Sequence, residues 1–200
     1  LVFAAEQLLP ASSMLFIVLK KGATYALVAV SMNLLNGFTG IFSLGQAGFM
    51  LLGAYTFAIF TIPEESREIV YQYYNGGLIR FALPVIPALV LSGLVAALFA
   101  FLVGLPVLKL KSDYLAIATL GFAEIIRVVI VNATSITNGS LGIKGIPGEA
   151  TLLTCYIWTV ITLIVLARLI FSNFGNVLRC IRDNEIAAGV MGINGCRYKV

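Results

Sequence analysis

The longest uncharged run is the feature that most constrains how this chain can fold. Residues 22–62 contain no Lys, Arg, Asp or Glu, and residues 81–108 and 150–167 are equally free of charge. The first run alone is about twice the roughly 20 residues that a helix needs to cross a bilayer. A soluble protein of 200 residues has too small an interior to bury such runs on all sides. The chain is therefore predicted to be an integral membrane protein.

The composition excludes several classes of function. Charged residues make up 11% of the chain, against roughly 25% in a typical globular domain. There is no His, which removes Ser-His-Asp and Cys-His catalysis and most zinc sites. The three cysteines are too far apart for a CxxC pair. The net charge of +4 is spread among loops, which argues against a nucleic-acid-binding face. We therefore expect membrane lipid around the chain, and no catalytic, cofactor or metal site within it.

The apolar segments predict an all-α fold, a polytopic transmembrane helical bundle with five to six membrane segments. Residues 1–19 form a weak first segment, which the lysine pair at 20–21 closes. Residues 22–62 are too long for one span, and glycines and small polar residues divide them at 37–46. We expect residues 1–200 to form a single transmembrane domain. The remaining spans are predicted at residues 81–108, 114–131 and 150–167.

Basic residues set the predicted orientation, because cytoplasmic loops of membrane proteins carry an excess of Lys and Arg. The tail from Arg168 onward is rich in arginine, and the short turn at 109–113 holds two lysines. The loop at 132–149 carries Lys144 as its single basic residue. The turn and the tail are therefore predicted to be cytoplasmic and the loop external. The topology of residues 1–62 is left open by this argument.

The break within the longest apolar run is the first candidate site. Ser43 and Gln46 have the spacing of a capping box, in which both side chains satisfy backbone N–H groups at a helix start. If this start lies at membrane depth, its N–H groups and positive dipole end form a site for a substrate carboxylate. Alternatively, the break is an ordinary turn at the membrane surface. The candidate residues of the translocation path are Ser43, Gly45 and Gln46.

A pair of opposite charges within a predicted span is the second candidate site. Glu124 and Arg127 are three residues apart and share a helix face, with Gly121 on the same side. Ionisable residues inside a membrane are costly and usually pair with each other in the interior of a bundle. The intramembrane ion pair is predicted to line a polar path or to lock two helices together. The alternative is a structural pair near the outer interface, with Arg127 extending toward the head groups.

The basic tail contains the third candidate, a short helix. Asp183 or Asn184 can cap a helix whose first turn holds Glu185, and Gly192 suits its C-terminus. The small residues at 187–189 predict a low-profile surface that a groove of another protein could approach closely. An amphipathic helix resting on the membrane surface is the alternative.

Four segments, in this order and spacing, are similar to one family of proteins. They resemble the membrane permease subunit of branched-chain amino acid ABC importers, specifically the M-type (LivM-like) of the two paired permeases, from about Tyr25 onward. The segments are SLGQAGFMLLGAYTFAI at 43–59, LPVLKLKSDYLAIATLGFAEIIRVV at 105–129, TNGSLGIKGIP at 137–147 and FGNVLRCIRDNEIAAGVMGINGCRYKV at 174–200.

The resemblance implies a set of partners and a role for the tail. The partners are a second permease subunit, two cytoplasmic ATPase subunits that use ATP, and an extracytoplasmic amino-acid-binding protein, in the plasma membrane of a bacterium or archaeon. The resemblance implies that residues 168–200 are a cytoplasmic coupling segment. Within it, the stretch from Glu185 to Gly192 is similar to the E-A-A…G loop by which importer permeases contact their ATPases, with one residue inserted after the Glu. ATPase docking is therefore the expected role of this segment. The family continues beyond this tail, so the resemblance implies a chain that is incomplete at its C-terminus. The implied ATPase-coupling residues are Arg182, Asp183, Glu185, Ala187, Ala188 and Gly192.

The expected function is therefore ATP-driven import of Leu, Ile and Val delivered by the external binding protein, with no enzymatic step in this chain. A permease for urea, amides or another small solute of the same superfamily is the alternative. An ion-coupled secondary transporter is a further class, and it would need a proton or sodium site in the membrane, for which Glu124 is the candidate carboxylate.

Overall fold

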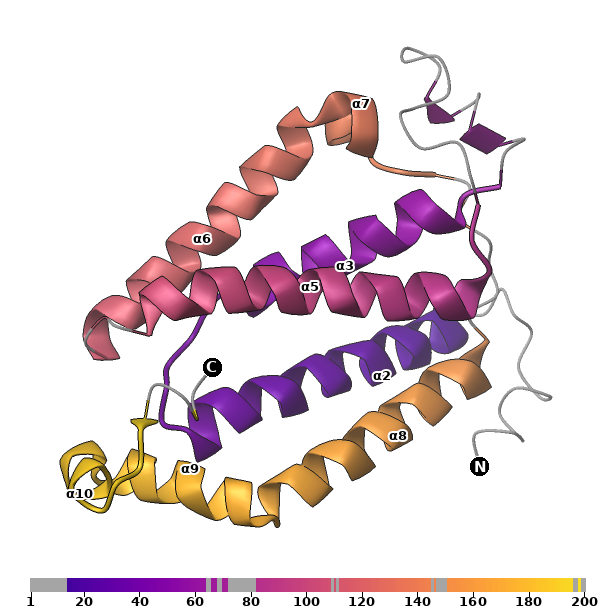
Figure 1. Cartoon of the computed structure of the whole chain (residues 1–200). Coiled ribbons are helices and arrows are strands. Elements are labelled where there is room, and N and C mark those ends of the chain that lie inside the picture. The colour runs from indigo at the N-terminus through magenta and orange to yellow at the C-terminus, as the bar shows by residue number, and fades with distance from the viewer. Residues whose placement is uncertain are drawn as a thin grey trace. The chain divides into compact units, whose positions relative to one another are not determined.

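Helix is the only regular secondary structure in the part of the chain that the structure describes. The computed structural model describes residues 14–63, 66–67, 70–71, 82–108, 110, 112–144, 146, 151–195 and 198. The predicted all-α class is confirmed, and Figure 1 shows the order of the helices along the chain. The chain forms two compact units, one made of residues 1–42 and 148–199 and the other of residues 43–147. The prediction of a single transmembrane domain stays a prediction.

The first unit is built on two helices that run in the same direction, followed by a short helical tail. Helix α2 (Met14–Asn33) continues into a π-helical turn, η1 (Leu34–Phe38), and packs beside α8 (Leu152–Ile170) (Figure 1). Thr151 caps the start of α8, because its side chain accepts a hydrogen bond from the Thr154 backbone N–H at 3.2 Å. Two tail helices follow, α9 (Asn173–Asp183) and α10 (Glu185–Val190).

The second unit packs a short helix against two longer ones. Helix α3 (Gln46–Thr61) contacts both α5 (Val85–Val107) and α6 (Ser112–Asn132). After α6 the chain forms two single turns, α7 (Thr134–Thr137) and the 3₁₀ turn η2 (Gly139–Leu141). Asn138 between them adopts a φ of 58°, a left-handed conformation that Asn tolerates better than most residues.

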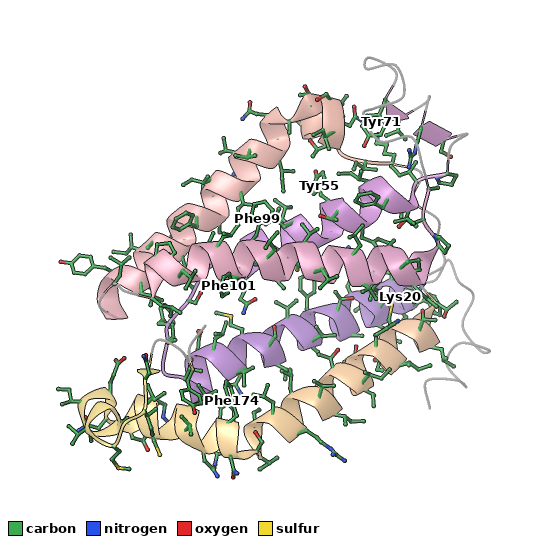
Figure 2. The ribbon with its side chains drawn as sticks, viewed as in Figure 1. Lys20, Tyr55, Tyr71, Phe99, Phe101 and Phe174 are labelled. Carbon is green, nitrogen blue, oxygen red and sulfur yellow. The ribbon has the colours of Figure 1, made fainter. Side chains whose placement is uncertain are left out.

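Four helices in the described residues are long and apolar enough to cross a membrane: Met14–Phe38, Val85–Val107, Tyr114–Asn132 and Leu152–Ile170. Their large side chains point outward, and Phe99 and Phe101 of α5 are 40% and 51% exposed (Figure 2). Such exposure would be unfavourable in water, and it suits helices surrounded by lipid. The protein is thus a multi-pass membrane protein.

The number of spans is slightly lower than the predicted five to six. Helix α3 has 16 residues and is therefore about 24 Å long, short of the roughly 30 Å hydrocarbon core. Of the weak first segment predicted at 1–19, residues 1–13 lie outside the described residues.

The lysine pair at 20–21 does not close a segment, contrary to the sequence prediction. Helix α2 begins at Met14 and continues through both lysines. The Lys20 ammonium lies 4.6 Å from the centre of the Phe16 ring, one turn earlier in the helix. A long aliphatic stem lets a lysine near a helix end keep its charge at the membrane interface, so the pair is compatible with a continuous span. Lys20 is labelled in Figure 2.

Candidate functional site

The predicted break in the longest apolar run is confirmed, and the predicted capping box is wrong. Regular helix stops after Phe38 and resumes at Gln46. The residue that caps α3 is Gly45, and no side chain supplies a capping hydrogen bond there. The Ser43 hydroxyl instead accepts a hydrogen bond from the Gly45 N–H at 3.4 Å. Because Gln46 is the first helical residue rather than the third, its amide is not placed as a capping box requires.

A residue that sequence reasoning missed, Thr119 of α6, holds the end of this break. Its hydroxyl accepts a hydrogen bond from the Leu44 backbone N–H at 3.1 Å and donates one to the Ala116 carbonyl at 3.0 Å. A Cβ added to Gly45 would lie 3.4 Å from the Thr119 Cβ, so the glycine permits this approach. The available signal was a hydroxyl within an apolar span, which tends to bond another backbone.

Small residues let α3 cross α6 closely just after the break. A Cβ added to Gly48 would lie 2.9 Å from the Ala123 Cα and 3.2 Å from its Cβ. Close approach over glycine and alanine is typical of helix packing in membranes. Ser43 and Gly45 are buried, whereas Gln46 is partly exposed. The start of α3 is therefore fixed against α6, and the role of these three residues in a translocation path stays a prediction.

The predicted ion pair of α6 forms. The Arg127 Nη1 lies 2.7 Å from the Glu124 Oε1, and both residues belong to one turn of the helix. Their side chains are 64% and 59% exposed, and nothing lies within 4 Å of a Cβ added to Gly121. The described residues therefore leave the pair uncovered, and its burial inside a bundle stays a prediction.

The predicted tail helix also forms, with Asn184 as its cap. The Asn184 Oδ1 accepts hydrogen bonds from the backbone N–H groups of Ile186 and Ala187 at 3.1 and 3.0 Å. Asp183, the other candidate cap, is the last residue of α9. Glu185 opens the first turn, and Gly192 follows the helix with a φ of 85°, which suits a glycine at a helix end.

The surface of α10 differs from the predicted one. Ala188 is buried at 4% exposure, so only part of the small-residue surface expected at 187–189 faces outward. Glu185, Ala187 and Gly189 face outward. The large exposed side chains beside them are apolar, namely Ile186, Val190 and Met191, at 82%, 84% and 74% exposure. The alternative of an amphipathic helix on the membrane surface implied an apolar face, but these three residues were not singled out from the sequence.

Two further coupling residues predicted from the sequence lie at the end of α9. The Arg182 Nη1 donates a hydrogen bond to the Gly37 carbonyl at 2.9 Å, which brings α9 to the end of the first span. The Asp183 Oδ1 accepts hydrogen bonds from the Nε and Nη2 of the same arginine, at 3.1 and 2.9 Å. Gly37 was not singled out as a functional residue by the sequence.

The loop after α3 contains a buried polar cluster. The Arg67 guanidinium, 4% exposed, donates hydrogen bonds to the carbonyls of Ile62 and Ile59 at 3.2 and 3.3 Å. The Tyr71 hydroxyl, labelled in Figure 2, donates to the Ile136 carbonyl at 2.7 Å. Burial raises the pKa of Tyr71, and the positive charge of Arg67 opposes that rise. This cluster joins the end of α3 to α7, which lies in the loop predicted to be external.

Comparison with known proteins identifies relatives over most of the chain. The chain is 31% identical to the high-affinity branched-chain amino acid transport system permease protein LivM of Salmonella typhimurium and to that of Escherichia coli. Each match covers 88% of this chain and 45% of the relative. The probable branched-chain amino acid transport permease protein LivM of Methanocaldococcus jannaschii is 27% identical over 84% of this chain and 56% of its own length. The chain thus spans about half the length of the curated relatives it matches.

The family match agrees with the architecture and with the resemblance found in the sequence. No solved structure gives a significant match to the chain. Residues 14–200 match the family described as the branched-chain amino acid transport system / permease component. Because this match extends from the start of α2 through the tail helices, the chain belongs to the family of branched-chain amino acid transport permease components.

Proposed function

We propose that the protein is a membrane-spanning subunit of an ATP-driven importer for branched-chain amino acids in the plasma membrane of a bacterium or archaeon. An external binding protein delivers the solute, a second permease subunit completes the pathway, and two cytoplasmic ATPase subunits supply the energy. The observation that carries this proposal is the exposed apolar face of α10, on a tail whose basic residues favour the cytoplasm. The family match supports the choice of solute.

The α10 face, made of Ile186, Val190 and Met191, is the proposed docking surface for the ATPase. Ile186 and Val190 are four residues apart and project from the same side of the helix. A short helix that presents apolar side chains in this spacing fits a hydrophobic groove of a partner. The Asn184 cap keeps the six residues of α10 helical without a partner, so docking loses less conformational entropy.

The start of α3 is the proposed part of the translocation path in this chain. Helix N-termini favour negative charge by about 0.3–1 kcal/mol, and by up to about 2 kcal/mol when partly buried. That range suits the transient binding of a substrate carboxylate. Among the three candidates, Gln46 is the partly exposed one, so its amide is the proposed contact. Cysteine at position 46, in a protein with its native thiols replaced, should react with small aqueous reagents to an extent that changes through the transport cycle. Equal reaction from the cytoplasm in every state would make the break a surface turn.

An ion-coupled secondary transporter is disfavoured by the position of its candidate carboxylate. Glu124 is 2.7 Å from Arg127, so the carboxylate already has a cationic partner, and the positive charge of that partner repels a second cation. Urea or an amide is the alternative solute. Neither carries a carboxylate, so either one would leave the α3 start without its proposed contact.

The test is solute uptake into vesicles that contain the full-length protein and its three kinds of partner. Radiolabelled leucine should be taken up when ATP is present on the side of the membrane that holds the ATPase subunits, and urea should not. Uptake that needs no ATP and that an ionophore abolishes would refute the proposal. Faster uptake of urea than of leucine would keep the importer and reject the solute.

The docking surface has its own test. Replacing Ile186 and Val190 with Asp should abolish copurification of the ATPase. A matched control is Leu141→Ser, because Leu141 is also exposed, at 63%, but lies in the predicted external loop. If the α10 variant still binds the ATPase, α10 is a membrane-surface helix rather than a docking helix.

A further inference from the structure

The backbone carbonyl groups at the end of α2 accept hydrogen bonds from an unusual set of donors. The π-helical turn η1 leaves carbonyl groups at the end of the α2 helix that require partners. The Thr39 hydroxyl and the Ile41 backbone N–H both donate to the Leu35 carbonyl, the latter at 3.3 Å. The Gly37 carbonyl is satisfied from elsewhere in the sequence, by the Arg182 Nη1 of α9 at 2.9 Å. A tail residue thus completes the cap of the first membrane helix.

The position of the Arg182 side chain is fixed on three sides. Asp183 accepts from its Nε and Nη2, which leaves Nη1 directed at the Gly37 carbonyl. Gly40 has a φ of 67°, and a Cβ there would lie 2.6 Å from the Arg182 Cγ, so the glycine makes room for the arginine stem. One turn earlier in α9, the Arg179 guanidinium lies 5.4 Å from the centre of the Phe38 ring. The same face of α9 therefore contacts η1 twice.

Helix α9 is also held at its other end. Gly175 packs against the Ile170 carbonyl at the end of α8, where a Cβ would overlap the backbone. Leu178 and Ile181 are buried between these two attachments, at 3% exposure each. A single residue, Asn184, separates α9 from α10. A force applied to α10 therefore acts on a helix that is attached to the ends of both α8 and α2.

We propose that Arg182 is a positioning residue that joins the coupling tail to the π-helical end of α2, through its hydrogen bond to the Gly37 carbonyl. The inference rests on the proposed function, in which the ATPase docks on α10. The docked ATPase moves α10, and α9 moves with it. The arginine transmits that movement to the end of α2, from which the chain continues into the break that precedes α3. Arg182 is thus assigned to the transmission of movement and not to the binding of the ATPase.

The test uses the full-length protein assembled with its ATPase, second permease and binding protein. It measures ATPase copurification, ATP hydrolysis and leucine taken up per ATP hydrolysed. Arg182→Met should leave copurification unchanged and lower uptake per ATP by roughly fivefold or more, the scale of one partly exposed charge-assisted hydrogen bond. Arg182→Lys should recover part of the loss, because an ammonium can reach a carbonyl but cannot hold the carboxylate of Asp183 with a planar fork.

A second variant displaces the arginine without changing any charge, and it carries the test if Arg182→Met fails to fold. Gly40→Asn tolerates the positive φ but fills the space of the Arg182 stem, so it should lower uptake per ATP in the same way. The control for the added side chain is Gly22→Asn, since Gly22 of α2 is exposed and nothing lies within 4 Å of an added Cβ. This control should keep the wild-type ratio.

Three results would overturn the inference. Wild-type uptake per ATP in both Arg182→Met and Gly40→Asn would show that the hydrogen bond to Gly37 transmits nothing. Loss of ATPase copurification in Arg182→Met, in proportion to the loss of uptake, would make Arg182 a docking residue and leave the proposed function intact. If the wild-type protein binds no ATPase at all, the proposed function fails, and the inference fails with it.

Discussion

Replacing Gly48 with Ala should destabilise the protein, although alanine is the better helix former. In an exposed helix interior the exchange would contribute up to about 1 kcal/mol of stability. At Gly48, however, the new Cβ would lie 2.9 Å from the Ala123 Cα and 3.3 Å from the Ile126 Cδ1. The nearest atom belongs to the backbone of α6, which cannot turn away as a flexible side chain can. Overpacking of this kind costs about 1–3 kcal/mol, so we expect a net loss of about 1–2 kcal/mol.

Gly53 of the same helix provides the matched control. Nothing lies within 4 Å of a Cβ added there, so Gly53→Ala should be neutral or stabilise the protein by about 0.5–1 kcal/mol. The measurement is the free energy of unfolding in detergent micelles, followed by the loss of helical circular dichroism during denaturant titration. Adding Ala123→Gly to Gly48→Ala should recover part of the loss, because it removes the 3.2 Å approach of the two Cβ atoms but leaves the new methyl group close to the α6 backbone. Equal stability of the Gly48 and Gly53 variants would refute the close crossing of α3 and α6.

Three further outcomes follow from the hydrogen bonds and the ion pair of this chain. Asn184→Ala should cost about 1 kcal/mol of α10 helix stability and weaken ATPase copurification, whereas Asn184→Ser should keep most of both. Tyr71→Phe should cost about 1 kcal/mol in the unfolding free energy, since the Ile136 carbonyl loses its donor. Because the pKa of Tyr71 is raised in the folded state above its ordinary 10.0, the folded protein keeps the proton longer. Wild-type stability should therefore fall as the pH rises through and above that value, and Tyr71→Phe should remove this part of the fall. The side chains of Glu124 and Arg127 are mostly exposed. A double-mutant cycle of Glu124→Gln and Arg127→Gln in the isolated protein should therefore give a coupling energy of no more than about 0.5 kcal/mol. A clearly larger coupling in the assembled complex would show that a partner covers the pair, and simple additivity there would show that none does.

The sequence predicted the features that depend on composition and on local chemistry. The uncharged runs at 81–108 and 150–167 located α5 and α8, and the glycines and small polar residues placed the break before α3. The chemistry of Asn184 and Gly192 placed both ends of α10. Each of these properties is decided by residues close together in the chain, which is why one sequence was enough to find them.

Features that depend on distant residues were not predictable in the same way. Ser43 and Gln46 had the correct spacing for a capping box, yet Ser43 bonds the Gly45 N–H, and the Leu44 N–H is bonded by Thr119, far along the chain. Arg182 was implied as a coupling residue by resemblance, but its acceptor at Gly37 is a backbone group, which leaves no mark in the side-chain pattern. The sequence therefore indicated local structure more reliably than contacts between residues far apart in the chain.

The shortness of α3 explains why polar groups gather at both of its ends. A helix of 16 residues ends inside or close to the hydrocarbon core, where lipid cannot satisfy the backbone groups that every helix leaves at its termini. At the first end, Thr119 accepts the N–H of Leu44, just before α3 begins. At the other end, the buried Arg67 donates to the carbonyls of Ile59 and Ile62. A guanidinium has five N–H donors and can serve several carbonyls at once, which an apolar or a singly donating side chain could not do. The chain can therefore hold a helix too short to span the membrane, because other parts of the same unit bond the backbone just before its start and the carbonyls at its end.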